Sequence, residues 1–344
     1  MTSTRKGRPK RISLKQIGQE LNVSESFVSK VLSGRMGTSS ARTEMAEAIR
    51  AKAAELGYRK NQTASALARG RHHVIAVMIH HHGNPGSGLV ESMLAGISTV
   101  ANGNGQRLAL SFFIGRKEFF AALPAVDGSE VDGLIIGGIS HPDILEELRE
   151  RQSPKVPVVT ILPDSPQNVF PNIGLDDSAL TYLTTAHLLA QGCRRLAHFS
   201  MFQSRLDGFM RAHADAGVAV VPELVVACKQ FSYADGVEAT QALLARELAF
   251  DGIVAQSDDH AVAAVNILTR RGIRVPAEVR VAGIDNSPVC PTCIVPLTSV
   301  SQNDRERGAD AAGRLLAAIA GESISSVSHA PTLYPRESSG PHLP

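Results

Sequence analysis

The chain has 344 residues, of which 43% are hydrophobic, so it is long and apolar enough to form two or three packed cores. No apolar run reaches the roughly 20 residues that a membrane helix needs, and the basic N-terminus lacks the apolar segment of a signal peptide. Four cysteines in so long a chain do not indicate a disulfide framework. These exclusions predict a cytoplasmic protein.

The net charge of +2 hides an uneven distribution along the chain. Residues 1–71 hold 15 Lys and Arg against 5 Asp and Glu, a net of +10, whereas the remainder has a net of −8. A basic surplus over a whole segment is typical of proteins that present one end to nucleic acid phosphates. Within the basic arm (residues 1–12), Arg8 between glycine and proline resembles an AT-hook, which enters the minor groove of A·T-rich DNA. The alternative is an arm that makes only unspecific phosphate contacts.

Two short amphipathic helices are predicted after the arm. Ser13 and Gln16 form a capping box for the first helix, in which Leu14, Ile17 and Leu21 make a buried stripe. The second helix covers residues 23–32 with Ser24 as its N-cap, and Val28, Val31 and Leu32 face inward. Its outward side chains are Glu25, Ser26, Ser29 and Lys30. The pair predicts a helix-turn-helix, whose second helix enters a DNA major groove, and the alternative is an ordinary helical hairpin.

A third helix is expected to begin between Ser39 and Thr43 and to end at Leu56, because Gly57 stands where helix C-termini favour glycine. The following stretch, residues 58–70, is too short and too polar to hold a helix unaided.

From Val74 onward, short apolar runs alternate with helical segments, which predicts an α/β body with parallel sheets. Strands are predicted over residues 74–79, 107–113, 131–136, 156–162, 195–200, 252–255 and 279–284. Helices are predicted over residues 89–102, 178–191, 205–216 and 261–271. Two such subdomains in series, without catalytic spacing in either, indicate a periplasmic-binding-protein-like core whose ligand lies in the cleft between them.

A series of short motifs runs through the chain. In the N-terminal part they are Ile17, Val23-Ser24, Val28 to Leu32, Leu56-Gly57-Tyr58, Asn61, Ala64 and Leu67. In the body they are residues 131–135, 174–177, 205–209, 272–276, 281–285, 296–300 and 336–339. Each motif is weak alone, but their ordered set covers nearly the whole chain and resembles the LacI/GalR family of bacterial transcription repressors.

The resemblance implies a helix-turn-helix domain over residues 13–59, a hinge helix over 60–70, an effector-binding and dimerisation core over 71–339, and a tail over 340–344. Within the core, the N-subdomain would comprise residues 71–170 and 301–328. The C-subdomain would comprise residues 171–300 and 329–339.

The family resemblance also implies how the chain contacts DNA. Glu25, Ser26 and Lys30 would approach base edges, Ser29 would lie near a phosphate, and Ser24 would belong to the same DNA-binding set. The hinge, with Asn61 and Ala64, would fold on the operator, and Leu67 matches the leucine that wedges between base pairs. Three departures affect this interpretation: Phe27 replaces a small residue, Lys60 replaces the proline usual before the hinge asparagine, and the loop before the third helix is longer by about two residues.

The effector residues are likewise implied by position. Arg205 matches the arginine that binds effector, and its planar guanidinium suits paired hydroxyls or a carboxylate. Asp285 ends an apolar strand and matches a cleft aspartate. Phe231 stands where relatives often place a stacking aromatic, and Ser257 and Asp258 close a strand at the cleft. For each residue the alternative is a purely structural role.

Two further motifs could carry other chemistry. His80, His81 and His82 end the first strand and could bind a metal, although adjacent residues in an extended chain point to opposite sides. A cleft-lining loop is the preferred interpretation, with His82 and Asn84 touching effector, and small residues follow where sugar-binding relatives often have aromatics. Cys290 and Cys293 have the C-x-x-C spacing of redox enzymes, but they lie in a loop with no helix start.

We therefore expect a dimeric transcription regulator, acting as a repressor, whose operator affinity is set by a small molecule such as a sugar, a sugar derivative or a nucleobase. No metal or cofactor is expected. An enzyme using the cysteines or histidines leaves the basic head unexplained, and a transport receptor conflicts with the helix-turn-helix and the absent signal peptide.

Overall fold

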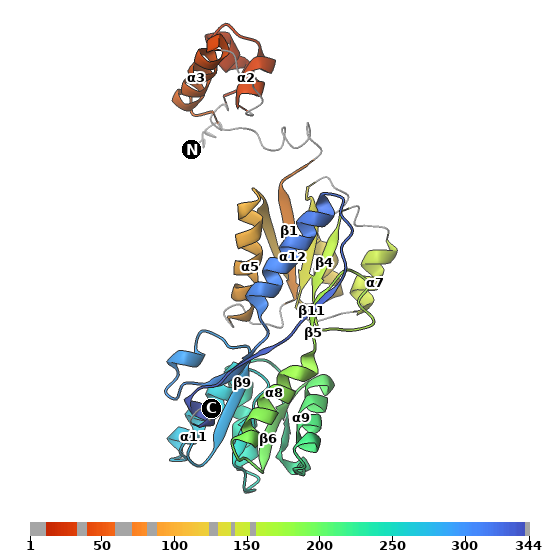
Figure 1. Cartoon of the computed structure of the whole chain (residues 1–344), viewed down its shortest axis with the longest axis vertical. Coiled ribbons are helices and arrows are strands. Elements are labelled where there is room, and N and C mark those ends of the chain that lie inside the picture. Colours follow the sequence, from red (N-terminus) through yellow and green to blue (C-terminus); the bar gives the residue numbers. More distant parts are fainter. Residues whose placement is uncertain are drawn as a thin grey trace, which may run out of the picture. The chain divides into compact units, whose positions relative to one another are not determined.

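The computed structural model describes residues 12–32, 40–58, 71–80, 88–123, 130–138, 142–151 and 156–340. The chain forms two compact units, residues 1–70 and residues 71–344, which Figure 1 shows with their main elements labelled. No helix within these described ranges is long and apolar enough to cross a membrane.

The described residues of the first unit form three helices, α1 (Leu14–Glu20), α2 (Glu25–Leu32) and α3 (Ser40–Glu55). Both predicted N-caps are confirmed, since the hydroxyl of Ser13 accepts from the backbone N–H of Gln16 and that of Ser24 accepts from Phe27, each at 3.2 Å. Gly57 has the predicted positive φ of 65°. The shared core consists of Ile17, Val28, Val31, Ala46, Ile49 and Ala53. The amphipathic spacing of the sequence therefore decides the packing of this unit.

Phe27, which departs from the family pattern, packs partly buried against this core. The turn between α1 and α2 is tight because Gly18 lies against the carbonyl of Val23, where an added Cβ would come within 2.6 Å of the oxygen.

The second unit begins with a four-stranded parallel sheet in the order β2-β1-β3-β4. Its strands are β1 (Val74–His80), β2 (Arg107–Phe113), β3 (Gly133–Gly137) and β4 (Val158–Ile161). Its helices are α5 (Leu89–Gly103), α6 (Arg116–Ala122), α7 (Pro142–Glu150) and α12 (Asp304–Ile319). Alternate residues of β1 divide the two faces: Ile75 and Val77 pack toward α5 and α12, and Ala76 and Met78 pack toward α6 and α7. We call this part the first lobe.

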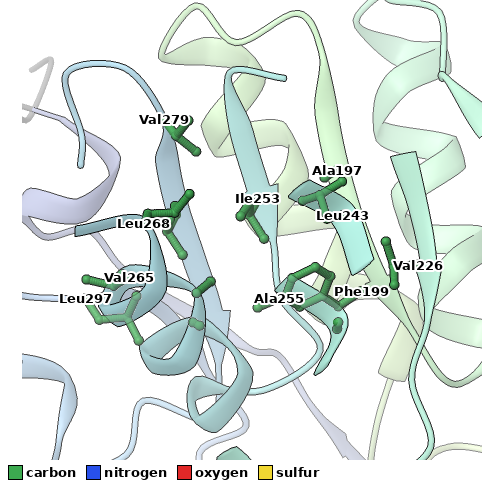
Figure 2. Packing of buried hydrophobic residues seen from close by; sticks show 14 of the residues in the cluster. Ala197, Phe199, Val226, Leu243, Ile253, Ala255, Val265, Leu268, Val279 and Leu297 are labelled. Carbon is green, nitrogen blue, oxygen red and sulfur yellow. The ribbon is translucent and has the colours of Figure 1, made fainter. Parts of the chain in front are cut away.

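The second lobe contains a six-stranded sheet in the order β12-β10-β9-β8-β6-β7, in which only the β10–β12 pair is antiparallel. Its strands are β6 (Leu196–Ser200), β7 (Val225–Ala227), β8 (Gly252–Val254), β9 (Arg280–Ile284), β10 (Thr298–Ser301) and β12 (Thr332–Tyr334). Its helices are α8 (Asp177–Ala190), α9 (Gln203–Asp215), α10 (Tyr233–Leu244) and α11 (Asp258–Arg270). Figure 2 shows the core on one face, where Phe199 and Ile253 of the sheet belong to the same cluster as Leu243 of α10, and where Val265 of α11 lies beside Leu297.

A two-stranded parallel ribbon, β5 (Ile173–Leu175) with β11 (Val327–His329), lies between the lobes in Figure 1. Helices α6, α7, α10 and α12 were not predicted from the sequence. The predicted start of α11 at Ala261 is wrong, because Ser257 caps the helix and Asp258 is its first residue.

Helices α5 and α12 of the first lobe meet through two glycines. A Cβ added to Gly96 would lie 2.0 Å from the carbonyl oxygen of Arg305, and one added to Gly308 would lie 2.3 Å from that of Met93. Any side chain at these two positions must push the helices apart, so the glycines fix the distance between α5 and α12.

We predict that Gly96→Ala lowers the free energy of unfolding by about 1–3 kcal/mol, the usual cost of overpacking a tight contact. Gly313→Ala is the matched control, because Gly313 lies in α12 with no atom within 4 Å of an added Cβ. The control should be neutral or stabilising by up to about 1 kcal/mol, since alanine is the better helix former. Urea denaturation of the two variants measures this, and equal stabilities would contradict the assigned glycine contact.

Candidate functional site

A cavity of about 540 Å³ lies where the two lobes meet. Its first-lobe wall includes Met93, Ile161 and Asp164, and its second-lobe wall includes side chains that follow β6, β7, β8 and β9. Because these strands are parallel, their carboxyl ends meet at one edge of the sheet, where ligands of open α/β sheets bind. Five predicted effector residues line this cavity together: Arg205, Phe231, Ser257, Asp258 and Asp285.

Arg205 is buried in the first turn of α9. Its Nε donates to Oδ1 of Asp177 at 2.9 Å, and its Nη1 donates to the backbone carbonyl of Gln256 at 2.6 Å. Gly208 makes this geometry possible, since an added Cβ would lie 2.0 Å from the carbonyl oxygen of Ser178 in α8. Among the described residues Nη2 has no hydrogen-bond partner, so it is the atom through which Arg205 can bind a ligand.

Asp285 follows β9 with a positive φ of 114°, a conformation that a non-glycine residue adopts only when its surroundings impose it. Its Oδ1 accepts a hydrogen bond from the side-chain amide of Gln302 at 2.7 Å. Burial, and then the nearby carboxylate of Asp258, raise the pKa of Asp285 well above its ordinary value. At this position the carboxyl group can accept from, or when protonated donate to, a polar group of a ligand.

Asp258 has a structural task as well as a place in the cavity wall. One carboxylate oxygen accepts from the hydroxyl of Ser299 at 2.6 Å, and the other accepts from the backbone N–H of Ser287 at 2.7 Å and the thiol of Cys290 at 3.0 Å. Burial raises the pKa of Asp258 to about 6. Gly283 is required beside it, because an added Cβ would lie 2.4 Å from Oδ1 of Asp258. Asp258 therefore positions the turn that carries Asp285.

Two phenylalanines form an aromatic part of the cavity wall. The rings of Phe202 and Phe231 lie 5.6 Å apart in a tilted arrangement, and the guanidinium carbon of Arg205 lies 5.7 Å from the centre of the Phe231 ring. Such a surface can stack on the apolar face of a ring-shaped ligand. Ser257 caps α11, its hydroxyl accepting from the backbone N–H of His260 at 3.4 Å.

An ion pair on the first-lobe side of the cavity was not predicted from the sequence. Arg307 and Asp304, one turn apart at the start of α12, are buried with Nη1 and Oδ1 3.3 Å apart. Burial raises the pKa of Asp304 to about 6 and lowers that of Arg307. Nη2 of Arg307 also donates to the carbonyls of Leu162 at 3.3 Å and Ile173 at 3.0 Å. The i, i+3 spacing was the available signal, but the helix itself was not predicted.

Among the described residues that line the cavity, carboxyl groups outnumber cations. Its acidic residues are Asp164, Asp177, Asp258, Asp259, Asp285 and Asp304, and its basic residues are Arg205 and Arg307. Both arginines are already paired with aspartates. The wall therefore offers a ligand mainly carboxyl groups, which can accept hydrogen bonds from hydroxyl or amino donors.

The predicted DNA-contacting residues of α2, together with its cap Ser24, form an exposed polar face. Glu25, Ser26, Ser29 and Lys30 are all exposed, opposite the buried Val28 and Val31. The predicted residues Arg8, Asn61, Ala64, Leu67, His82 and Asn84 lie outside the described residues.

The surroundings of His80, Cys290 and Cys293 are those of residues with a structural role. His80 is buried, and its Nε2 lies 2.7 Å from the carbonyl oxygen of Ile114. Cys290 begins a 3₁₀ turn, Cys290–Thr292, where the sequence indicated only a loop. Burial and the nearby Asp258 raise the pKa of both Cys290 and Cys293. This is the direction opposite to that of a reactive redox thiolate.

Comparisons with known proteins place this geometry in context. A periplasmic binding protein-like domain family matches residues 185–339. The chain is 29% identical over 325 residues to the HTH-type transcriptional regulator GntR of Pseudomonas aeruginosa, which spans 92% of this chain and 91% of the relative. It is 30% identical over 264 residues to the HTH-type transcriptional regulator DegA of Bacillus subtilis, which spans 74% of this chain and 77% of the relative. Its fold is similar to that of the Lac repressor dimer bound to operator and the anti-inducer ONPF. The TM-score is 0.83 at 22% identity, and the match covers 96% of this chain and 100% of that chain.

His198 in β6 gives the second lobe a testable pH dependence. Its Nδ1 lies 3.0 Å from the carbonyl oxygen of Val254, its ring stacks on Phe209, and burial lowers its pKa to about 4. Below the ordinary pKa of about 6.5 the unfolded chain binds a proton that the folded chain does not, so folding loses stability as the pH falls.

Between pH 7 and pH 4, we predict that the wild-type chain loses about 3 kcal/mol more unfolding free energy than His198→Gln, which cannot take up the proton. Denaturant titrations at several pH values give the unfolding free energy of each protein, and the slopes of the two pH profiles are compared. Parallel pH profiles for the two proteins would show that His198 titrates normally in the fold.

Proposed function

Because the chain belongs to the LacI/GalR family of transcription regulators, we propose that it is a repressor that binds a split operator as a homodimer and is controlled by a small molecule in the cavity between its lobes. The relatives are named as transcription regulators, and the function of this chain is regulation of transcription rather than catalysis. The observation that carries the effector proposal is the convergence of Arg205, Asp285 and Phe231 on one cavity.

The exposed face of α2 supports direct reading of bases in the major groove. Glu25 can accept from the amino group of cytosine, Lys30 can donate to guanine, and Ser29 suits a phosphate. The net charge of +10 over residues 1–71 supplies the unspecific attraction to the DNA backbone. The hinge residues Asn61, Ala64 and Leu67 are proposed to enter the minor groove, with Leu67 as the wedge, and Arg8 of the arm is proposed to lie in flanking A·T-rich DNA.

The composition of the cavity narrows the proposed effector to a neutral or amine-bearing molecule rich in hydroxyl groups, such as a sugar or a nucleoside. Arg205 would bind it through Nη2, Asp285 would exchange hydrogen bonds with its hydroxyls, and Phe231 would stack on its ring. A phosphorylated or carboxylate ligand would meet a surplus of carboxyl groups with both arginines already paired. The effector acts by binding one arrangement of the lobes more tightly than another.

An apolar edge of the first lobe supports the proposed homodimer. Strand β2 lies at the edge of its sheet, and Leu110, Phe112 and the following Ile114 are 45%, 37% and 66% exposed. Exposed apolar side chains on an edge strand are a liability unless another surface covers them. A second copy of the chain is the proposed cover, and its two-fold symmetry suits an operator with two half-sites.

We predict that Lys30→Ala weakens binding to the selected operator by about 5- to 150-fold and relaxes the base preference at one position of each half-site. The measurement is selection from random duplexes followed by sequencing of the retained DNA, for wild-type and variant proteins. Lys15→Ala, which removes the same charge from exposed α1, is the control and should leave the base preference unchanged. Recovery of the same palindrome with unchanged affinity by Lys30→Ala would reject the assigned recognition face.

A second prediction concerns the cavity. Arg205→Ala should leave operator affinity within about twofold but abolish its response to the effector, because the ligand loses Nη2 and the ordered Asp177 pair. A metabolite screen that monitors release or retention of operator DNA provides the measurement. Arg274→Ala, at an exposed arginine paired with Glu278, is the control and should respond as wild type does. A full effector response in Arg205→Ala would show that the effector binds elsewhere.

A further inference from the structure

A second cluster of polar side chains lies in the second lobe, outside the walls of the cavity. It consists of Cys228, which follows β7, Asp235 in the first turn of α10, and His260 in the first turn of α11. A sulfur, a carboxylate oxygen and an imidazole nitrogen from these residues all lie within 4.8 Å of one another and are buried. The three side chains come from different elements, so only the tertiary fold brings them together.

Asp235 and His260 are held in place by hydrogen bonds with their neighbours. Nε2 of His260 lies 3.1 Å from Oδ2 of Asp235, and its Nδ1 lies 2.8 Å from the hydroxyl of Ser257. The backbone N–H of Lys229, in the loop between β7 and α10, also donates to Oδ2 of Asp235 at 3.1 Å. Helices α10 and α11 approach closely here, because a Cβ added to Gly236 would lie 2.7 Å from Cα of His260.

We propose that Cys228, Asp235 and His260 form a binding site for a zinc-class divalent cation. Thiolate sulfur, imidazole nitrogen and carboxylate oxygen are the donors that zinc takes in proteins, and three protein ligands leave the fourth tetrahedral position to water. Bonds of about 2.0–2.3 Å place tetrahedral ligand atoms about 3.3–3.8 Å apart, so small side-chain rotations complete the site. Binding requires the thiolate of Cys228, whose proton is released to solvent.

Two details distinguish the cluster from an ordinary group of hydrogen bonds. The hydroxyl of Ser257 contacts the imidazole nitrogen that faces away from Asp235, which is the arrangement that orients a histidine for metal binding. The sulfur of Cys228 reaches the carbonyl oxygen of Val226 only at 3.9 Å, and its other hydrogen-bond partner is the carboxylate of Asp235, itself a member of the cluster. A cation bound between these side chains would replace the contact between sulfur and carboxylate by two metal–ligand bonds.

The site would also act on the effector cavity, because the loop between Cys228 and Asp235 carries Phe231. A metal bound to both ends of this loop and to His260 of α11 would hold Phe231 in place in the cavity wall. The cation is therefore a structural or regulatory ligand, and its binding does not depend on the function proposed above.

The proposal is tested on the full-length protein, stripped of metal with a chelator and titrated with Co²⁺. We expect saturation at one cobalt per chain, with the ultraviolet charge-transfer absorption of a cobalt–thiolate bond and displacement by Zn²⁺. Cys228→Ser should abolish this absorption and weaken binding at least on the order of tenfold, and His260→Gln should weaken it similarly. Cys293→Ser is the control for other thiols and should keep both the absorption and the affinity.

Thermal unfolding guards against misfolded variants. Zn²⁺ should raise the Tm of the wild-type protein and of Cys293→Ser, because a ligand that binds only the folded state stabilises it. It should leave the Tm of Cys228→Ser unchanged while that variant, without metal, melts as the metal-free wild type does. No thiolate absorption in the wild-type protein, or absorption that survives in Cys228→Ser, would overturn the proposal. Neither the cobalt titration nor the thermal unfolding uses DNA or effector. A negative result would therefore reject the metal site without bearing on the proposed repressor function.

Discussion

The effector cavity depends on one buried carboxylate, that of Asp258. It lies in the first turn of α11, where the helix dipole favours a negative charge, and it accepts hydrogen bonds from Ser287 and Ser299. These bonds join the turn after β9 to β10 and α11. Within that turn Asp285 and Asn286 both have positive φ, at a cost of about 1–3 kcal/mol each. The carboxylate thus maintains the strained backbone that directs Asp285 toward the cavity.

Buried ion pairs lie on both sides of the cavity. Each contributes more to the position of its arginine than to the net stability of the fold. The ion pairs of Arg205 with Asp177 and of Arg307 with Asp304 both pay a desolvation cost that their attraction offsets only with further hydrogen bonds. Backbone carbonyls of Gln256, Leu162 and Ile173 supply those bonds. Since removing one partner strands a buried charge, each pair fixes the position of its arginine.

The sequence predicts the parts of the chain that local patterns control. Helix caps at Ser13 and Ser24, and the alternation of buried strands with helices, follow from side-chain spacing and are confirmed. Arg205 and Asp285 were placed by family position, and the structure brings them to one cavity. The role of Asp258 and the backbone partners of Arg307 were not accessible, because these contacts span 29 to 145 residues of the chain. The start of α11 was misplaced because Ser257 and Asp258 were assigned to a strand end rather than to a helix cap.

Helix α12 explains why a ligand in this cavity can act beyond it. Its first turn places Asp304 and Arg307 in the cavity wall, and its glycine contact with α5 fixes it in the core of the first lobe. Arg205 and Asp285 belong to the second lobe, so a ligand bonded to residues of both walls favours one relative arrangement of the lobes. A ligand held by one lobe alone would have no such preference, however tightly it bound. The first lobe begins at residue 71, directly after the segment proposed as the hinge.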